Sequence, residues 1–240
     1  MKIAIIGYGK MGHVIEQIAK ERGHEVVLIL DALINPQDFT AENLRKADVA
    51  IEFTRPDAAF DNYIKCFNAG IPVVSGTTGW LEKLPEVQRI CKEEGRTFFY
   101  SSNYAIGVNI FFRVNKFLAK LMNHYSDFDI SMQEIHHIHK LDKSSGTANT
   151  IAEGILENVE RKDSWTLDNK PTDKQIYIDV VREGEVPVTH TVNYTSPIED
   201  ITITHTSHNR NGLALGAVLA AEFLVGKPSG FYTMDDLMQF

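Results

Sequence analysis

The start of the chain constrains the fold more than any other stretch. Residues 2–6 form a continuous apolar run, typical of a strand buried on both faces of a parallel sheet. Apolar residues then recur at helical spacing up to Arg22, and a second apolar run, residues 25–30, ends at Asp31. Between the first run and the helix stands a G-x-G-x-x-G sequence, Gly7-Tyr8-Gly9-Lys10-Met11-Gly12. Strand, glycines, helix, strand and acid in this order predict a dinucleotide-binding fold.

Each position in this arrangement has a physical role. Gly7 permits a tight turn, Gly9 lets the backbone approach a pyrophosphate, and Gly12 lets the helix pack closely on the strand. Asp31 lies about 20 residues beyond the glycines, where a carboxylate is expected to bind a ribose hydroxyl. That carboxylate would repel the extra phosphate of NADP, although Lys10 could partly compensate. We therefore expect NADH or NADPH, with NADH favoured. A glycine-rich turn in an unrelated α/β domain is the alternative.

Strands and helices keep alternating up to residue 100. Strands are expected at 48–53, 71–75 and 97–100, helices at 57–69 and 84–94, and a short polar connection at 32–46. Together with the strands at 2–6 and 25–30, these make five strands, which predict a Rossmann-like doubly wound parallel sheet. Such a sheet binds its ligand at the carboxyl ends of the strands. Further cofactor contacts are expected there, from Gly76, Thr77, Thr78, Ser101, Ser102, Asn103 and Tyr104. A plain turn at 76–79 is an equally good interpretation.

The pattern changes after Gly107. A strand at 127–135, a helix after Thr147, a polar loop at 161–174 and three alternating strands near 175–182, 188–194 and 201–206 predict an α+β domain with a mixed or antiparallel sheet. A final helix at 213–225 can return to cover the first sheet. The predicted domains are 1–104 completed by 212–240, and 105–211. One helical stripe is expected in the core of the second domain: Ile110, Phe111, Val114, Phe117, Leu118, Leu121 and Met122.

Residues 134–148, EIHHIHKLDKSSGTA, carry the densest chemistry in the chain. Histidines beside a lysine suit general acid/base work near neutral pH. The Ser-Ser-Gly-Thr part, if it opens a helix, directs backbone N–H groups and a positive dipole end toward an anion such as a carboxylate or phosphate. For any one histidine alone, a zinc site, a solvated strand end or a satisfied core group is the better interpretation.

Charge and apolar pattern exclude several classes of function. A net charge of -8 argues against a surface for nucleic acid or an anionic membrane. The longest apolar stretch, 212–226, is interrupted by Glu222 and is too short for a membrane span. No signal peptide is recognisable, and Cys66 and Cys91 match neither a disulfide framework nor a metal site. We expect a cytoplasmic protein with reduced thiols and a small-molecule substrate.

Taken together, these segments resemble the dihydrodipicolinate reductases, also called 4-hydroxy-tetrahydrodipicolinate reductases. Residues 134–148 are similar to the signature E-x-H-H-x-x-K-x-D-x-x-S-G-T-A of that family, and the resemblance covers the whole chain. It implies reduction of 4-hydroxy-tetrahydrodipicolinate to tetrahydrodipicolinate by NAD(P)H, in diaminopimelate and lysine biosynthesis. It also implies a cytoplasmic homotetramer joined through the sheets of the second domain. The other similar segments are 7–12, 52–54, 76–78, 101–104, 230–237 and the pair His205 and Arg210.

The resemblance also assigns roles to residues. His136 matches the acid/base histidine and Lys140 the second proton donor, while the substrate-carboxylate site matches His137, Gly146 and Thr147. Hydride addition to the substrate ring leaves an enamine-like carbon, and an imidazole or ammonium can supply the proton that it needs. Glu134 and Asp142 are expected to orient these groups, and His139 to be structural. No metal is expected.

Two departures from the family pattern are visible. Ser144 stands where the family usually has proline, so the loop is expected to be less rigid, and the connection after Asp31 is short. Other assignments also stay open. Another dehydrogenase of amino acids, such as a diaminopimelate or aspartate dehydrogenase, would share the first half without needing the histidine segment. A dinucleotide-sensing regulator would bind NADH without turnover. A zinc site at His136, His137 and His139 lacks a cysteine or a ligand from another element.

Overall fold

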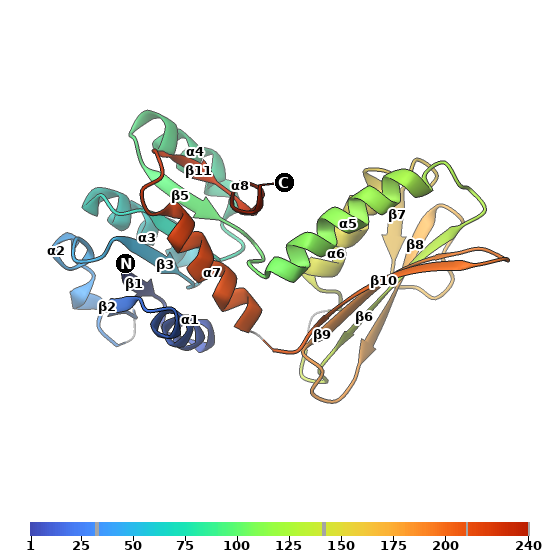
Figure 1. Cartoon of the computed structure of the whole chain (residues 1–240), viewed down its shortest axis with the longest axis horizontal. Helices are drawn as coiled ribbons and strands as arrows, with labels where there is room; N and C mark the ends of the chain where they lie inside the picture. The colour runs from blue at the N-terminus through green and yellow to red at the C-terminus, as the bar shows by residue number, and fades with distance from the viewer. Residues whose placement is uncertain (32–33, 141–142, 210, 240) are drawn as a thin grey trace. The chain divides into compact units, whose positions relative to one another are not determined.

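The chain forms two compact units, and the second is inserted in the sequence of the first. The computed structural model describes residues 1–31, 34–140, 143–209 and 211–239 (Figure 1). The first unit comprises Met1–Ala105 and Asn211–Phe240, and the second comprises Ile106–Arg210. Both ends of the chain therefore belong to the first unit. None of the helices in the described ranges has the length and apolar character that a bilayer crossing requires.

The first unit is built on a six-stranded parallel sheet with the strand order β11-β5-β4-β3-β1-β2. The central strands β1, β3 and β4 are buried along nearly their whole length, which explains their continuous apolar sequences. This confirms the predicted Rossmann-like doubly wound sheet. The strands are β1 (Lys2–Ile6), β2 (Glu25–Leu30), β3 (Val49–Glu52), β4 (Val73–Ser75), β5 (Thr97–Tyr100) and β11 (Gly230–Tyr232).

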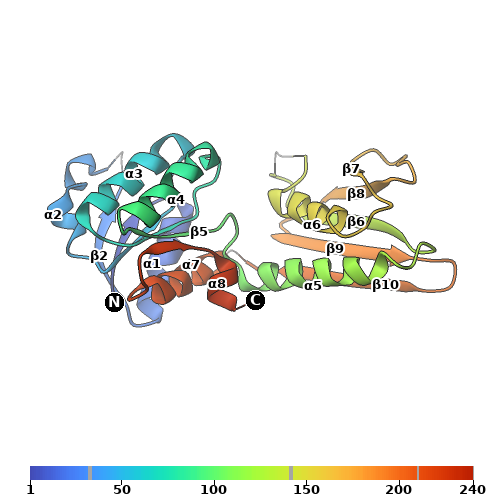
Figure 2. The ribbon, with the colours of Figure 1, turned by 90° about the horizontal axis from the view of Figure 1, so that it is seen from above.

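Helices cover both faces of this sheet. Figure 2 shows α3 (Pro56–Ala69) and α4 (Leu84–Glu93) on one face, with α1 (Lys10–Glu21) and α7 (Asn211–Leu224) on the other. The last long helix therefore returns to the first sheet, as its sequence predicts. It packs without a side chain at Gly216, where a Cβ atom would lie 1.8 Å from the carbonyl oxygen of Tyr104. Short helices complete the unit: η1 (Pro36–Asp38), α2 (Ala41–Leu44), η2 (Leu81–Lys83) and α8 (Met234–Met238).

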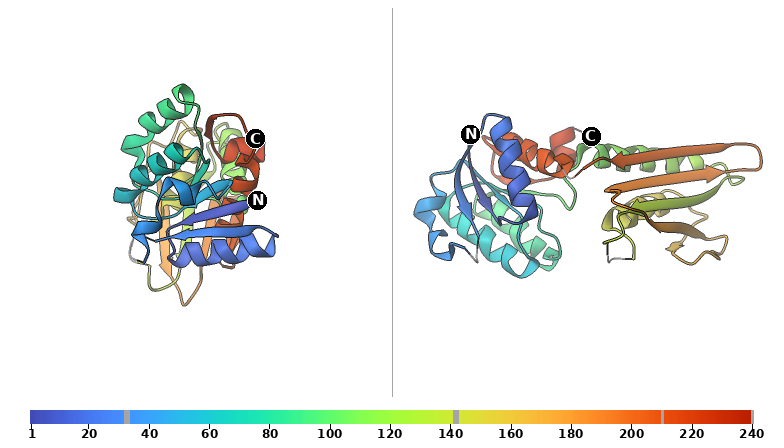
Figure 3. Two further views of the ribbon diagram at one scale, coloured as in Figure 1. Left: turned by 90° about the vertical axis from the view of Figure 1, so that its left-hand side faces the viewer. Right: turned by 90° about the horizontal axis from the view of Figure 1, so that it is seen from below.

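The second unit contains a five-stranded mixed sheet with the strand order β10-β9-β6-β8-β7. The pairs β6–β8 and β7–β8 are parallel, whereas β6–β9 and β9–β10 are antiparallel. In the right-hand view of Figure 3 the strands can be followed from β10 through β9 and β6 to β8. The expected α+β domain with a mixed sheet is thereby confirmed. Its strands are β6 (Asp129–His136), β7 (Ser164–Thr166), β8 (Gln175–Arg182), β9 (Val188–Thr195) and β10 (Asp200–Ser207).

Two helices, α5 (Ile106–Met122) and α6 (Gly146–Leu156), pack with one face of this sheet in a single core. Along β6 the buried residues alternate with partly exposed ones, as expected for a strand with one covered face. The first two inward side chains, Ile130 and Met132, are apolar, and the next two are Glu134 and His136. The inward face thus changes from core to polar cluster along this one strand.

Three details differ from the sequence predictions. The strand β7 lies inside the predicted polar loop 161–174, and β11 adds a sixth strand to the predicted five. The apolar stripe of α5 is only partly core. Phe111 and Met122 are buried, but one edge of the stripe is exposed because the helix turns a single face toward the sheet. The core prediction is therefore wrong for Ile110, Val114, Phe117 and Leu121, which are 44–65% exposed.

Candidate active site

The glycine loop between β1 and α1 has the geometry that a bound dinucleotide needs. Gly7 has φ +92°, and a Cβ atom there would lie 2.1 Å from the carbonyl oxygen of Phe53. A Cβ atom at Gly12 would lie 2.4 Å from the carbonyl oxygen of Gly7, so helix and loop touch directly. At Gly9, by contrast, no heavy atom of the described residues lies within 4 Å of that position. The backbone of Gly9 is therefore open to a phosphate.

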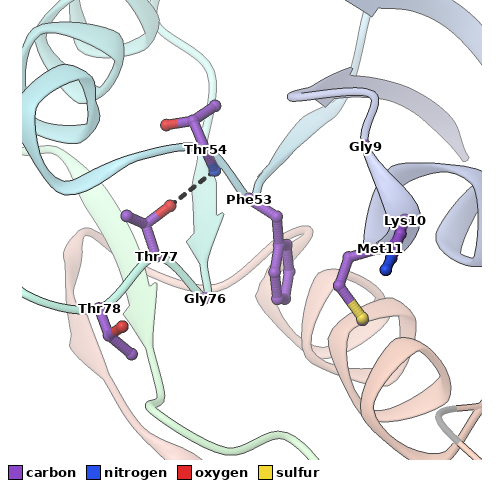
Figure 4. A pocket seen from close by; sticks show the side chains of 8 residues that line it. All are labelled: Gly9, Lys10, Met11, Phe53, Thr54, Gly76, Thr77 and Thr78. Atoms are coloured by element: carbon purple, nitrogen blue, oxygen red, sulfur yellow. Dashed lines mark hydrogen bonds between the residues drawn. The ribbon is translucent and has the colours of Figure 1, made fainter. Parts of the chain in front are cut away.

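A pocket of about 310 Å³ opens beside this loop. Its walls come from the carboxyl ends of three neighbouring strands, β1, β3 and β4, and Figure 4 shows the side chains of Phe53 and Met11 directed into it. The backbone N–H of Thr54 donates a 2.8 Å hydrogen bond to Oγ1 of Thr77, which ties two of the walls together. The lining residues are Gly9, Lys10, Met11, Phe53, Thr54, Gly76, Thr77 and Thr78.

A buried carboxyl group holds the pocket threonines in place. Glu52, the last residue of β3, is fully buried and accepts hydrogen bonds from Ser75 (2.8 Å), Thr77 (3.0 Å) and Thr54. Burial raises the pKa of Glu52, and the hydroxyl donors partly oppose that increase. Phe53 and Thr54 were not predicted as lining residues, nor was Glu52 predicted as their support. Their sequence signal is a glutamate at the end of an otherwise apolar strand, followed by a polar turn.

The other predicted cofactor residues lie around this pocket rather than in its lining. Asp31 follows β2, and its Oδ2 accepts a 3.3 Å hydrogen bond from the backbone N–H of Tyr8. The carboxylate thus lies next to the glycine loop. After β5, the buried hydroxyl of Tyr104 donates a 2.6 Å hydrogen bond to the carbonyl of Ser75, and Ser101 Oγ donates to the carbonyl of Asn103. Ser102 is exposed. These contacts order the turn after β5.

The second unit carries a cluster of buried polar groups at the carboxyl end of β6. Glu134 is opposite His190 in the register of β6 and β9, and both side chains point into the unit. Oε2 of Glu134 lies 3.6 Å from Nε2 of His190 and 3.8 Å from Nδ1 of His136. The two imidazole rings are 5.7 Å apart and nearly perpendicular. The exposed fractions are 0% for Glu134, 2% for His190 and 8% for His136.

Ser145 connects this cluster to the start of α6. It is the N-cap residue, because its Oγ accepts a 3.0 Å hydrogen bond from the backbone N–H of Ala148. The same hydroxyl donates to Oε2 of Glu134 (2.6 Å), and the Ser145 N–H donates to both carboxylate oxygens (3.1 and 3.2 Å). The Ser-Gly-Thr sequence does open a helix, which begins at Gly146 and continues with Thr147.

Burial and hydrogen bonding set the charges in the cluster. Burial raises the pKa of Glu134, but the adjacent His190, the hydrogen bonds from Ser145 and the nearby His136 outweigh burial and hold the pKa at about 2. Burial is the main cause that lowers the pKa of His136 to about 4. The carboxylate of Glu134 raises this pKa, whereas repulsion from His190, Lys140 and Arg182 lowers it further. At neutral pH, without a ligand, Glu134 is therefore a carboxylate and His136 a neutral imidazole.

The remaining residues of the segment differ in exposure. His137 and Lys140 are half-buried, and the backbone N–H of Lys140 donates to the carbonyl of His137 (3.2 Å). His139 is on the surface, where its Nε2 lies 3.0 Å from Glu185. Gly146 is exposed at the first turn of α6. Asp142, which was expected to orient these groups, lies outside the described residues, as does Arg210.

Sequence reasoning missed His190 and the capping role of Ser145. The only local signal for His190 is its place on the inward, otherwise apolar face of β9. Within the described ranges, a group of donor atoms with metal-like spacing is formed by Glu134, His136 and His190, all within 4.8 Å of one another. His137 and His139, which the zinc alternative requires, are not in that group.

Comparison with known proteins gives a consistent result along the chain. The family model described as "Dihydrodipicolinate reductase, N-terminus" matches residues 1–104, and that described as "Dihydrodipicolinate reductase, C-terminus" matches residues 107–238. A 4-hydroxy-tetrahydrodipicolinate reductase of Christiangramia forsetii is 48% identical over 238 residues, which are 99% of this chain and 98% of the relative. A Staphylococcus aureus protein of the same name is 36% identical over 247 residues, covering 99% and 100%.

Solved structures show the same fold. A dipicolinate-bound dihydrodipicolinate reductase from Paenisporosarcina sp. TG-14 aligns with a TM-score of 0.76 and 22% identity, covering 97% of each chain. A diaminopimelate dehydrogenase of C. glutamicum aligns with a TM-score of 0.52 and 14% identity, covering 100% of this chain and 98% of the other. Both likenesses concern the fold alone.

Proposed function

The chain belongs to the dihydrodipicolinate reductase family and is an NAD(P)H-dependent oxidoreductase that reduces 4-hydroxy-tetrahydrodipicolinate to tetrahydrodipicolinate, and from this premise we propose how its residues divide the work. The first unit binds the cofactor and the second binds the substrate. The reaction serves diaminopimelate and lysine biosynthesis. The observation that carries the assignment of roles is the buried cluster of Glu134, His136 and His190, joined through Ser145 to the start of α6.

The glycine loop and the neighbouring strand ends form the cofactor site in this proposal. The open backbone at Gly9 and the first turn of α1 accept the pyrophosphate, because N–H groups at a helix start bind anions. Asp31 accepts a hydrogen bond from a ribose hydroxyl, which favours NADH, and Lys10 in the pocket lining permits some use of NADPH. The turns after β4 and β5 supply further contacts: Gly76, Thr77, Thr78, Ser101, Ser102, Asn103 and Tyr104.

We assign substrate binding to the segment that joins β6 to α6. The backbone at Gly146 and Thr147 begins an eleven-residue helix and is suited to a carboxylate. His137 and Lys140 lie on the same connection and can attract the second carboxylate of a cyclic dicarboxylate, either the substrate or dipicolinate, the ligand of the related Paenisporosarcina structure. Support comes from the rigid attachment of this helix start: Glu134 accepts three hydrogen bonds from Ser145.

Overall the reaction adds one hydride and one proton and releases the 4-hydroxyl group of the substrate as water. NAD(P)H, when bound, would supply the hydride, and the protein supplies the proton. His136 is the proposed donor to the enamine-like carbon, and Lys140 is the second donor. In the free enzyme burial keeps the pKa of His136 low, at about 4. Two substrate carboxylates next to the ring favour its charged form and raise that pKa, so that His136 gains its proton when substrate binds. Glu134, 3.8 Å from Nδ1, orients the ring.

The uncovered face of the second sheet supports a homotetramer. The described helices pack on one face only, and the other face carries threonines in register, with Thr191 and Thr204 joined by a 3.2 Å hydrogen bond across β9 and β10. We propose that this face packs against the same face of other copies, because two sheets can stack face to face. The mass of the protein in solution tests this.

Buried, unpaired Cys66 and Cys91 fit the proposed cytoplasmic location.

An NADH oxidation assay with substrate made freshly by the preceding synthase tests the function. We expect oxidation that depends on the substrate. NADH binding without turnover would instead support a dinucleotide-sensing regulator. Turnover with diaminopimelate or aspartate alone would assign the chain to another dehydrogenase. Both results would contradict the proposed reaction.

A further inference from the structure

His190 contacts the elements that hold the proposed substrate site, but it is neither a proposed proton donor nor a proposed ligand of a substrate carboxylate. It lies on β9, its Nε2 is 3.1 Å from Oγ of Ser145 at the start of α6, and the same atom is 3.6 Å from Oε2 of Glu134 on β6. Its ring meets that of His136 edge to face. A single buried imidazole therefore joins the helix start that would bind a carboxylate to the strand that carries the proton donor.

We propose that His190 is a positioning residue of the reductase, which acts through Ser145 and Glu134 to fix both the first turn of α6 and the ring of His136. This inference rests on the proposed roles of His136, Gly146 and Thr147. It goes beyond them, because His190 lies on a different strand and acts only by fixing the positions of other residues. In this proposal His190 contacts neither the reacting carbon nor the cofactor.

The hydrogen-bond inventory of Ser145 fixes the direction of the contact with His190. A serine hydroxyl has one proton, and the carboxylate of Glu134 can only accept, so the 2.6 Å contact uses that proton. Ser145 Oγ must then accept from Nε2–H of His190, as it also accepts from the backbone N–H of Ala148. His190 is thus held as a donor at Nε2, and its tautomer follows from its neighbours.

Burial makes the cluster depend on every member. Glu134 is 0% exposed, and a buried carboxylate without its donors is costly, so loss of one donor rearranges the others. Removing the Nε2–H donor takes away the contact that ties β9 to Ser145, so that the hydrogen bonds of Ser145 to Glu134 and Ala148 must hold the helix start alone. The other titratable or charged groups near the cluster include His136, on the same strand as Glu134, and Lys140, which disfavours the charged form of His136. Arg182 on β8 lies 4.0 Å from Glu134, and His205 on β10 is opposite His190. Among the described residues, the donors to Ser145 Oγ are His190 and the backbone N–H of Ala148.

Two substitutions at one position separate donor chemistry from packing. His190→Gln keeps a side-chain N–H donor. His190→Leu introduces an apolar side chain of similar bulk and removes the donor. The matched control is Tyr194→Phe, which alters the same inward face of β9 at a hydroxyl that is buried without a hydrogen-bond partner among the described residues. Each variant is assayed for kcat, for KM of substrate, for dipicolinate affinity, for NADH affinity and for melting temperature.

We expect His190→Leu to lower kcat/KM by about 10²-fold, as small misplacements of reacting groups do. It should also weaken dipicolinate binding while leaving NADH affinity unchanged. His190→Gln should recover most of the loss, and Tyr194→Phe should match the wild type. Wild-type kcat/KM in a folded His190→Leu variant would overturn the inference. Equal loss in both His190 variants, in step with melting temperature, would overturn it too, because that is the signature of a purely structural residue.

A spectroscopic measurement keeps the inference testable if His190→Leu does not fold. In the wild-type protein, ¹⁵N-labelled histidine should show His190 protonated at Nε2, and His190→Gln should shift the ring signals of His136. A His190 signal protonated at Nδ1 alone would overturn the inference. Failure of the proposed function would look different: the wild type would not bind dipicolinate, or His136→Gln would turn over normally. Failure of this inference leaves both of those results as expected.

Discussion

The carboxylate of Glu134 lies 3.8 Å from Nδ1 of His136, and both groups are buried. In the proposed mechanism this relationship gives the proton donor, His136, a charge state that depends on the bound ligand. Burial favours the neutral ring, Glu134 favours the charged ring, and burial prevails in the free protein. A bound dicarboxylate adds negative charge near His136 and, like Glu134, favours the charged form of its ring. We therefore expect the acid form of His136 in the substrate complex rather than in the free enzyme.

His136→Gln should lower kcat by about 10²- to 10⁴-fold with a smaller change in KM, because proton donation belongs to the transition state. The control is His139→Gln, a surface histidine of the same segment that pairs with Glu185, and we expect it to keep the wild-type kcat. Steady-state NADH oxidation measures both. An unchanged kcat in His136→Gln would remove this residue from the mechanism.

Dipicolinate binding should take up a proton near pH 6. The pKa of His136 is about 4 before binding, so the ring is neutral at that pH, and the dianionic ligand raises the pKa. Calorimetric titration in buffers of different ionisation enthalpy measures the number of protons taken up. The uptake should disappear in His136→Gln. Binding without proton exchange in the wild type would show that the ring stays neutral in the complex.

The second unit should lose stability in acid over two adjoining ranges. The folded-state pKa of His136 is lowered from 6.5 to about 4, so the unfolded chain binds the extra proton between those values and stability falls as pH drops from 6.5 to 4. The pKa of Glu134 is lowered from 4.5 to about 2, so its contribution is present above pH 4.5 and is lost as pH falls toward 2. Melting temperature against pH records both ranges. His136→Gln should flatten the upper one only, and an unchanged slope there would contradict this assignment.

Alanine at two glycines should separate cofactor binding from folding. Gly12→Ala places a Cβ atom 2.4 Å from the carbonyl oxygen of Gly7 and should cost about 1–3 kcal/mol of unfolding free energy by overpacking. Gly9→Ala meets no described atom within 4 Å and should fold normally, but it should weaken NADH binding because it obstructs the backbone that faces the pyrophosphate. Denaturant titration and NADH titration give the two quantities. Wild-type NADH affinity in Gly9→Ala would place the pyrophosphate elsewhere.

Cofactor choice should depend on Asp31. Its carboxylate lies at the glycine loop, where it would bind a ribose hydroxyl and repel an added phosphate. We expect a higher kcat/KM with NADH than with NADPH, and a smaller ratio in Asp31→Ser. Asp163→Ser, at an exposed carboxylate of the second unit, should leave the ratio unchanged. A wild-type advantage of about tenfold for NADPH would contradict the expected preference.

The sequence predicted the parts of the fold that have strong local signals. Buried parallel strands are uninterrupted apolar runs that end at glycines or polar turns, so β1 to β5 are recognisable. The strands β7 and β11 are only three residues long, which is too short to show an alternating pattern of apolar and polar residues. They form strands because they pair with β8 and β5, respectively. The apolar stripe of α5 could not be divided into buried and exposed edges, because hydrophobicity does not state which side meets the sheet.

The same limit applies to the site. His136 belongs to a local motif, and its acid/base role was predicted from that motif. His190 comes from a distant strand, and only the register of β6 and β9 places it opposite Glu134. Glu52 likewise acts on Thr77 from another strand of its own sheet. Contacts between strands depend on pairing and register, which no window of sequence contains.

The order of units along the chain has a consequence for synthesis on the ribosome. The first unit is interrupted after Ala105 and resumes at Asn211, so it lacks α7 and its edge strand β11 until the final residues are made. The inserted unit is contiguous and can fold first, while the first unit is still incomplete. The two break points also lie close together, since a Cβ atom at Gly212 would be 3.8 Å from that of Ala105. A short linker could therefore splice them, leaving a stand-alone dinucleotide-binding protein.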